Sequence, residues 1–272
     1  MANIFAERLI VNNETKENII YNEHLARYEL AKEIIAARGG AKKILEAACG
    51  SGYGSKILAE TGAQKVVAID ISPEAIQSAK ELYSSPNIKY VLGDVKNIKE
   101  ENNSFDFIAS FETIEHIDDP GLFLKELKRV LKDDGLAVIS TPNNEVFGEK
   151  NPFHLKEFSR SEFAELIGKY FRYFKIIEQG NGLASFIKGG AGETKMSKFC
   201  DLNNFKPLYF IAVCSQVSFS GQILEKNIIS INFSALQNIY NNPGLKIINK
   251  IYTLLVKIPG VKKLLRSGRK TE

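Results

Sequence analysis

Short apolar runs alternate with segments of helical periodicity through the middle of this chain. Each run is bounded by glycine, proline or polar residues, as buried strands are. Between the runs, apolar residues recur every three or four positions, which favours amphipathic helices. Strands that alternate with helices require a parallel sheet. We predict strands over residues 44–48, 66–70, 88–92, 105–111 and 136–140, with helices over 55–60, 73–83 and 120–131.

The same patterns continue beyond the fifth strand. A helix is predicted over 161–169, and two further strands over 173–178 and 208–214. The start of the helix over 73–83 is well marked, because Ser72 can cap it and Pro73 suits its first turn. The fold class is therefore α/β, with seven strands in one sheet.

Three parts of the chain differ in composition. Residues 1–40 are predicted to form a helical cap, with a helix over 22–35 that Gly39-Gly40 ends. Residues 41–216 hold the alternating strands and helices, and 217–272 form a basic amphipathic extension. The connection over 179–206 is rich in Gly, Ser, Asn and Lys. A connection this long is usually functional or disordered, and we interpret it as a lid on the acceptor side, with disorder as the alternative.

Composition places the chain among ordinary globular proteins. Of 272 residues, 44% are hydrophobic and 25% are charged. No run of eighteen apolar residues occurs, so no membrane-spanning helix is expected. The first residues lack the basic segment and apolar core of a secretion signal. Cys49, Cys200 and Cys214 have no metal-binding or redox spacing, which favours a reducing cytoplasm.

The net charge of +4 is unevenly distributed. From Pro243 onward eight basic residues stand against one acidic residue, whereas the rest of the chain carries a net −3. Apolar residues beside lysines over 243–270 favour a helix lying on an anionic membrane surface. The alternative is a helix packed on the domain or on a partner, with a solvated basic face. Nucleic-acid binding is disfavoured, because the rest of the chain is acidic and lacks a basic, aromatic face.

The first predicted strand runs into Gly50, Gly52 and Gly54 and then into a helix. Glycines at such a turn permit positive φ and let the backbone approach a ligand closely. Their spacing is one residue shorter than a dinucleotide fingerprint, which argues against a pyrophosphate site. Asp70 ends the second strand, where a carboxylate accepts from ribose hydroxyls. These residues predict a mononucleoside site with little phosphate.

Glu46, the three glycines and Asp70 together resemble the class I S-adenosylmethionine (SAM) methyltransferases. The resemblance implies a Rossmann-like sheet of seven strands with helices on both faces, whose last pair of strands is an inserted antiparallel hairpin. Ala48 departs from the pattern, since the family usually has a further glycine there.

The resemblance also implies which residues bind SAM. Asp94 and Val95 are assigned to the adenine amino group, and Arg27 to the methionine carboxylate. The alternatives are a turn residue for Asp94 and a solvated surface arginine for Arg27. The complete predicted set is Arg27, Glu46, Ala48, Gly50, Gly52, Asp70, Ile71, Asp94, Val95 and Phe111.

A second group of residues follows the fourth strand. Glu112, Glu115 and His116 have a Glu-x-x-Glu-His spacing, and His154 comes much later. A hydroxyl acceptor is a poor nucleophile until a base or a metal takes its proton. We predict Glu115, His116 and His154 as catalytic residues, with either histidine as general base. The alternatives are a divalent cation held by Glu112, Glu115, His116 and His154, or a segment that only shapes the pocket.

This second group resembles the O-methyltransferases of ubiquinone biosynthesis and those that methylate the terminal ribose of small RNAs. Over residues 1–178, Ser110-Phe111-Glu112 and Phe153-His154-Leu155, with the glycine motif, look like prokaryotic methyltransferases of surface-polysaccharide and glycolipid assembly. The resemblance implies O-methylation of a sugar hydroxyl on a glycan or glycolipid, in the cytoplasm or at the inner membrane face. The alternatives are a small lipophilic or phenolic acceptor such as a quinone precursor, an RNA end, and a non-catalytic adaptor of a glycosyltransferase.

Overall fold

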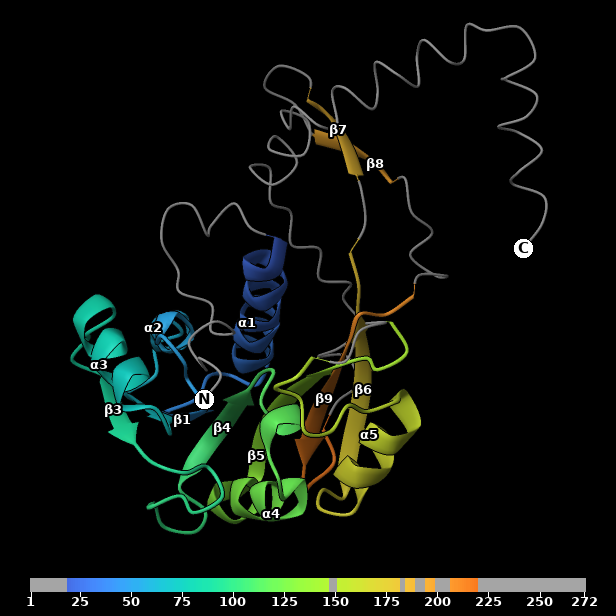
Figure 1. Ribbon diagram of the computed structural model, residues 1–272. Helices are drawn as coiled ribbons and strands as arrows, with labels where there is room; N and C mark the ends of the chain where they lie inside the picture. Colours follow the sequence, from blue (N-terminus) through green and yellow to red (C-terminus); the bar gives the residue numbers. More distant parts are fainter. Residues whose placement is uncertain (1–18, 147–150, 182–183, 189–193, 199–205, 220–272) are drawn as a thin grey trace, which may run out of the picture.

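The computed structural model of the protein describes residues 19–146, 151–181, 184–188, 194–198 and 206–219 (Figure 1). The helices and the short 3-10 turn η3 are α1 (Ile19–Ala37), α2 (Tyr53–Ala59), α3 (Pro73–Leu82), η3 (Ile114–His116), α4 (Pro120–Val130) and α5 (Arg160–Gly168). The strands are β1 (Lys43–Ala47), β2 (Lys65–Asp70), β3 (Ile88–Leu92), β4 (Phe105–Ser110), β5 (Leu131–Pro142), β6 (Tyr173–Gln179), β7 (Ala184–Lys188), β8 (Thr194–Lys198) and β9 (Tyr209–Ser215).

Seven of these strands form one sheet in the order β3-β2-β1-β4-β5-β9-β6. β1 to β5 pair in parallel, and β9 runs antiparallel between β5 and β6. The predicted α/β sheet, including its inserted antiparallel strand, is confirmed. The strand order reverses between β1 and β4, and the carboxyl ends of the strands at such a reversal open a ligand-binding crevice.

Helices cover both faces of the sheet, as predicted. Neighbouring residues of β1 point to opposite faces, because side chains alternate along a strand. Leu45 packs with Phe123 of α4 in the cluster that also includes α5. Ile44 packs with Ile34 of α1 in the cluster that includes α2. The predicted cap of α3 is present, since the Ser72 hydroxyl accepts from Ala75 N at 3.1 Å.

The N-terminal helix is part of the main core. α1 contributes Tyr28, Leu30 and Ile35 to the cluster that it shares with β1, β2 and β4. The helix predicted over 22–35 is confirmed and begins at Ile19. In Figure 1, α1 stands at the end of the sheet to which the β4 arrow points. The helix therefore covers the carboxyl edge, where a ligand would lie.

The structure corrects the loop predicted over 179–206. This connection contains β7 and β8, which pair with each other as a separate antiparallel sheet. Its role as a lid stays a prediction. The basic extension beyond residue 219 and Cys200 lie outside the described residues, while Cys49 and Cys214 are buried thiols. Within the described part of the chain, no helix has both the length and the apolar character needed to cross a bilayer.

Candidate active site

The glycine turn after β1 has a left-handed backbone. Ala48, Gly50 and Gly52 have φ angles of +65°, +52° and +87°. Gly52 N donates to Cys49 O at 3.0 Å and closes the turn. A methyl group on Gly52 would overlap Ala79 of α3, whereas one on Gly50 would meet open space. The turn is therefore packed against α3 and open at Gly50, as a ligand-binding turn requires.

Ala48 adopts a left-handed backbone conformation, which a glycine would adopt without steric strain. A left-handed alanine costs about 1–2 kcal/mol relative to the right-handed form. The next residue anchors the turn to β2, since Cys49 N donates to Ile69 O at 2.9 Å. Backbone strain of this kind persists where the surroundings fix it and is concentrated at ligand sites. The departure from the family pattern therefore leaves the geometry of the turn intact.

Asp70 is buried at the end of β2 and braces the glycine turn. Its Oδ2 accepts from Gly50 N at 2.8 Å, and its Oδ1 accepts from Ser72 N at 2.9 Å. Each carboxylate oxygen has a second lone pair, so the group can also accept from ribose hydroxyls. The structure brings Asp70 and Gly50 together, as their spacing predicted.

Glu46 lies behind the turn and is buried. Its Oε1 accepts from the Tyr28 hydroxyl at 2.6 Å, and its Oε2 accepts from the Ser55 hydroxyl. Burial raises the pKa of Glu46 to about 7, although both hydroxyl hydrogen bonds oppose the shift. A methyl group on Gly54 would overlap Tyr28 and Glu46. Glu46 thus connects α1 to the turn through tightly packed contacts.

Two apolar side chains are exposed at the carboxyl ends of β2 and β3. Ile71 is 67% exposed and Leu92 is 55% exposed. Asp94 Oδ1 accepts from Lys96 N at 2.8 Å, which is the role of a turn residue. The Val95 side chain belongs to the core, so only its backbone can meet a ligand. Exposed apolar surface of this kind next to Asp70 can pack against a flat base.

Aromatic side chains hold α1 against the turn. The Phe111 ring meets the Tyr28 ring edge to face, with centroids 5.0 Å apart. Tyr28 also packs on Tyr53, at 5.5 Å. The Tyr53 hydroxyl lies 2.9 Å from His24 Nδ1. Phe111 therefore belongs to the wall beneath α1, next to the predicted donor site.

Glu112 follows β4 in a left-handed conformation, with φ +49°. Ser140 of β5 holds it twice: Glu112 N donates to Ser140 Oγ at 3.0 Å, and Ser140 Oγ donates to Glu112 Oε1 at 2.6 Å. A non-glycine residue keeps this conformation only where its neighbours fix it. Ser140 therefore determines where the Glu112 carboxylate lies.

Glu115, His116 and His154 meet in space. One ligand atom of each lies within 4.8 Å of the other two. Glu115 is fully buried: its Oε2 accepts from the Thr141 hydroxyl at 3.3 Å, and its Oε1 has no hydrogen-bond partner among the described residues. Glu112 is not in this group of three, because its carboxylate is engaged with β5. The structure thus assembles the three predicted catalytic residues and three of the four predicted metal ligands.

The hydrogen bonds of the two histidines define their neutral tautomers. His116 Nδ1 lies 3.0 Å from Phe153 O, a group that can only accept, so this nitrogen donates. His154 Nδ1 lies 3.0 Å from Glu157 Oε1, and its Nε2 lies 3.1 Å from Asn151 Nδ2. Each neutral ring therefore carries its lone pair on Nε2, and the lone pair of His154 accepts from the Asn151 side-chain amide. The lone pair of His116 suits a general base or a metal ligand, whereas that of His154 can serve only after Asn151 Nδ2 moves away.

Burial raises the pKa of Glu115 well above its usual range, and the negative charge of Glu112 adds to this. The positive charge of Arg27 acts in the opposite direction. Burial and the charge of Glu112 thus favour the protonated form of Glu115, and a nearby positive charge favours the ionised form.

Arg27 is fully buried at the ends of β6 and β9. Its Nη1 donates to Gln179 Oε1 at 2.8 Å, and its guanidinium carbon lies 4.5 Å from the centre of the Tyr209 ring. Its Nε and Nη2 are buried without a hydrogen-bond partner in the described part of the chain. The interpretation as a solvated surface arginine is therefore wrong. Two unpaired donors on a planar cation fit a carboxylate ligand.

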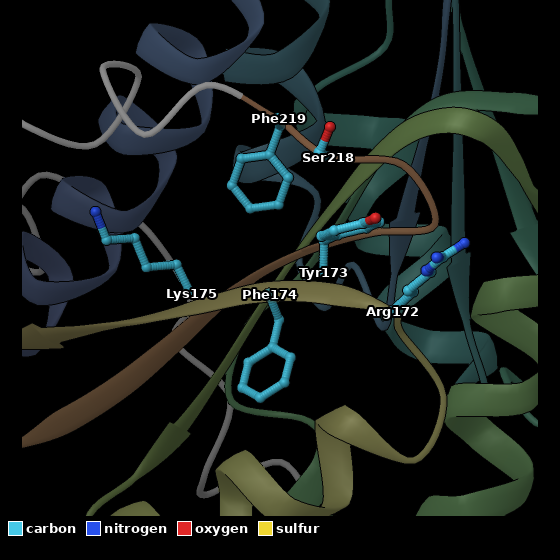
Figure 2. Close-up of a pocket in the computed structure, with 6 residues that line it drawn as sticks. All are labelled: Arg172, Tyr173, Phe174, Lys175, Ser218 and Phe219. Carbon is cyan, nitrogen blue, oxygen red and sulfur yellow. The ribbon is translucent and has the colours of Figure 1, made fainter.

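A hollow elsewhere does not belong to this site. Figure 2 shows it at the amino end of β6, lined by Arg172, Tyr173, Phe174, Lys175, Ser218 and Phe219. Gln179 ends the same strand, roughly 20 Å away at about 3.3 Å per residue. The hollow thus lies at the edge of the sheet opposite the carboxyl ends.

Sequence reasoning missed four residues of the site: Tyr28, Ser140, Gln179 and Tyr209. A signal existed for Tyr28, which neighbours Arg27, and for Ser140, which lies near the end of a predicted strand. No local pattern marks the contact of Arg27 with Gln179, because 152 positions separate them.

A family profile described as a methyltransferase domain matches residues 45–139, which include the glycine turn, Asp70 and the Glu-x-x-Glu-His segment. The fold and the site thus define a class I methyltransferase. A malonyl-[acyl-carrier protein] O-methyltransferase of Ilyobacter polytropus is 30% identical over 217 residues, 71% of this chain and 78% of that protein. This chain belongs to the family of class I SAM-dependent methyltransferases.

Other relatives match part of the chain. A protein of Mycobacterium tuberculosis, named as a probable SAM-dependent methyltransferase, is 31% identical over 153 residues. That match covers 54% of this chain and 55% of the relative, so the chain spans about half the length of this curated protein. A ubiquinone biosynthesis O-methyltransferase of Xanthomonas campestris is 30% identical over 149 residues, 54% of this chain and 60% of that protein.

Solved structures share the fold. The methyltransferase domain of bacterial CtHen1 has a TM-score of 0.53 at 18% identity, covering 71% of this chain and 99% of that one. A chain from the Haloferax volcanii complex of the Trm112 methyltransferase activator with a methyltransferase has a TM-score of 0.52 at 17% identity, covering 72% and 92%.

Proposed function

We propose that this protein transfers a methyl group from SAM to a hydroxyl oxygen of its acceptor. The proposal rests on one observation. Glu115, His116 and His154 lie close together at the same edge of the sheet as the turn that Gly50 and Asp70 form. Transfer to oxygen needs a group that removes the hydroxyl proton, and the cluster supplies one beside the donor site.

The residues present fit SAM. The turn is open at Gly50, Asp70 can accept from the ribose, and Ile71 offers apolar surface to the adenine. The backbone of Val95 and Asp94 would border the adenine. Phe111 would flank the adenine or the methionine portion of SAM. Nε and Nη2 of Arg27, which have no partner among the described residues, would hold the methionine carboxylate. When bound, SAM supplies a methyl group on a positively charged sulfur, which needs no further activation.

The chain's own part is to orient the acceptor and to take its proton. His116 Nε2 lies 3.9 Å from Glu115 Oε1, so a proton received on His116 lies beside a carboxyl group. The ionised form of that carboxyl stabilises an imidazolium. His154 is the alternative base once its Nε2 is released from the Asn151 amide, and its hydrogen bond to Glu157 orients its ring. The hydroxyl oxygen is then free to attack the methyl group in line with the sulfur.

A divalent cation is a second way to activate the hydroxyl. Glu115 and the two imidazoles offer one carboxylate and two nitrogen ligands, and Glu115 Oε1 has no hydrogen-bond partner in the described part of the chain. Glu112 is close enough to raise the pKa of Glu115 and would complete the set if its carboxylate left Ser140. Dialysis against EDTA tests this: lost turnover that Mg²⁺, Mn²⁺ or Zn²⁺ restores supports the cation, whereas unchanged turnover contradicts it.

For the acceptor we propose a sugar hydroxyl of a glycan or glycolipid, on the resemblance of the motifs over residues 1–178. A small lipophilic or phenolic molecule is the second candidate, favoured by the likeness to the Xanthomonas ubiquinone biosynthesis O-methyltransferase. The two differ in polarity, so they can be separated by extraction of the product.

The test is a methyl-transfer assay with radiolabelled SAM and separate pools of glycans, lipid extract, phenolic compounds and RNA. Label in a base-stable ether of the glycan or lipid pool supports the proposal. Label in the phenolic pool supports the second candidate. Label in the RNA pool, or SAM binding without label in any pool, contradicts both.

A further inference from the structure

Gln179 and Tyr209 mark the two ends of the connection that carries β7 and β8. Gln179 is the last residue of β6, and Tyr209 is the first residue of β9. They are paired across the sheet. Both contact Arg27, one through a hydrogen bond and one through its ring. The base of the connection therefore supports the buried guanidinium.

Contacts to α1 lock this support in place. Gln179 Nε2 donates to Glu23 O at 2.9 Å, while its Oε1 accepts from Arg27. The Tyr209 hydroxyl donates to Glu23 Oε2 at 2.6 Å. The side-chain amide of Asn181 donates to the other oxygen of the Glu23 carboxylate. Both carboxylate oxygens of Glu23 are thus bonded to Tyr209 and Asn181, so this carboxylate does not pair with Arg27.

A buried guanidinium without an anion is costly, and a bidentate carboxylate is its natural complement. Nη1 is fixed by Gln179, which leaves Nε and Nη2 as the pair of donors without partners among the described residues. These two nitrogens lie on one edge of the planar group and match the two oxygens of a carboxylate. The Tyr209 ring covers a face of the group.

Packing contacts place Arg27 next to the donor turn. Tyr28, the next residue of α1, donates to Glu46 behind the turn at 2.6 Å. Its ring packs on Tyr53, directly after the turn, and on Phe111. Arg27 therefore lies where α1 meets both the turn and the ends of β6 and β9.

We propose that Gln179 and Tyr209 are positioning residues, which hold Arg27 so that Nε and Nη2 grip the carboxylate at the methionine end of the donor. This inference rests on the proposed function. It adds that the far half of the sheet, and the base of the β7–β8 connection, take part in donor binding.

The test uses two ligands of the full chain, measured by calorimetry. S-adenosylhomocysteine carries the amino-acid carboxylate, whereas 5′-methylthioadenosine keeps the nucleoside and lacks it. Gln179→Met removes the acceptor for Nη1 and keeps the size of the side chain. We expect about tenfold weaker binding of S-adenosylhomocysteine, because Arg27 loses a residue that orients it. Binding of 5′-methylthioadenosine should be unchanged.

Arg27→Met is the reference variant. We expect about 100-fold weaker binding of S-adenosylhomocysteine, and no further loss when Gln179→Met is added, because Gln179 acts through Arg27. Tyr209→Phe keeps the ring but removes the hydrogen bond to Glu23. We expect a smaller loss of affinity for S-adenosylhomocysteine and no loss for 5′-methylthioadenosine. Gln216→Met is the matched control: Gln216 donates to Tyr170 O at 3.0 Å, away from Arg27.

Equal loss of both ligands in Gln179→Met would show a general structural role and overturn the proposal. An unchanged affinity of Arg27→Met for S-adenosylhomocysteine would also overturn the proposal. It would indicate that Arg27 binds an acidic group of the acceptor and not the donor. Failure of the unaltered protein to bind either ligand would instead contradict the proposed function itself.

Discussion

The two halves of the sheet solve the problem of buried charge differently. In the half formed by β3, β2 and β1, Glu46 and Asp70 have both carboxylate oxygens hydrogen bonded to hydroxyls or backbone amides. Beside the half formed by β4, β5, β9 and β6, Arg27 of α1 and Glu115 of η3 keep buried polar atoms without partners in the described part of the chain. The buried carboxylates of the first half are therefore satisfied without a ligand, whereas Arg27 and Glu115 can still bind an anion and a cation.

The first prediction tests the packing around Glu46 in the first half of the sheet. Gly54→Ala adds a methyl group where Tyr28 and Glu46 lie, so both must move and their hydrogen bond is lost. Overpacking together with a broken buried hydrogen bond destabilises by about 4 kcal/mol. Urea unfolding measures this. Gly93→Ala is the control, because its added methyl group would only touch Ile69 at 3.4 Å. Equal stability of the two variants would contradict the packing described.

The second prediction concerns Glu46, whose pKa rises from 4.5 to about 7 through burial. Between these values the folded state holds more protons than the unfolded one, so stability falls as pH rises. The contribution is complete below pH 4.5 and lost above pH 7. Glu46→Gln does not titrate, so it should lack this fall of about 3 kcal/mol at 1.36 kcal/mol per pH unit. Parallel unfolding curves of both proteins over pH 4.5–8 would contradict it.

The third prediction tests the second half. His154→Ala should lower the methyl-transfer rate about 100-fold, by loss of a base or of a ligand. Glu157→Gln keeps the ring but weakens its orientation, so we expect about a tenfold loss. S-adenosylhomocysteine binding should be nearly unchanged in both, because we propose that His154 acts on the acceptor and not on the donor. Equal activity of all three proteins would remove His154 from the mechanism.

The fourth prediction concerns Ser140, which holds Glu112 in its left-handed conformation. Ser140→Ala should lower the rate about tenfold, and Ser140→Thr should restore most of it, because the hydroxyl returns. Ser110→Ala is the control: it removes a buried hydroxyl that donates to Ala47 O on a neighbouring strand. If both alanine variants lose the same activity, Ser140 has only a structural role.

The same contrast explains what the sequence could predict. The parts that depend on neighbouring residues were predictable: the strand pattern, the glycine turn, the position of Asp70 at the end of β2 and the Ser72 cap. The Glu-x-x-Glu-His segment is also local, and η3 places Glu115 and His116 together. Its partner His154 was predicted through family resemblance alone.

Contacts between distant residues were not predictable. Tyr209 and Glu23 are 186 positions apart, and neither polarity nor periodicity marks them as partners. Glu112 turns towards Ser140 because its backbone is left-handed. Glutamate rarely adopts this conformation, so the residue type did not predict it. The strands β7 and β8 were missed because they form a separate two-stranded sheet in a connection rich in glycine and lysine.

Calorimetric titration of the purified protein with S-adenosylhomocysteine shows whether the donor's product binds at the glycine turn. We expect one binding site and competition by 5′-methylthioadenosine. The Asp70→Ala variant should bind S-adenosylhomocysteine more weakly, because it lacks the carboxylate that we propose for the ribose. Absence of binding, or binding that Asp70→Ala leaves unaltered, would contradict a SAM site at the carboxyl ends of β1 and β2.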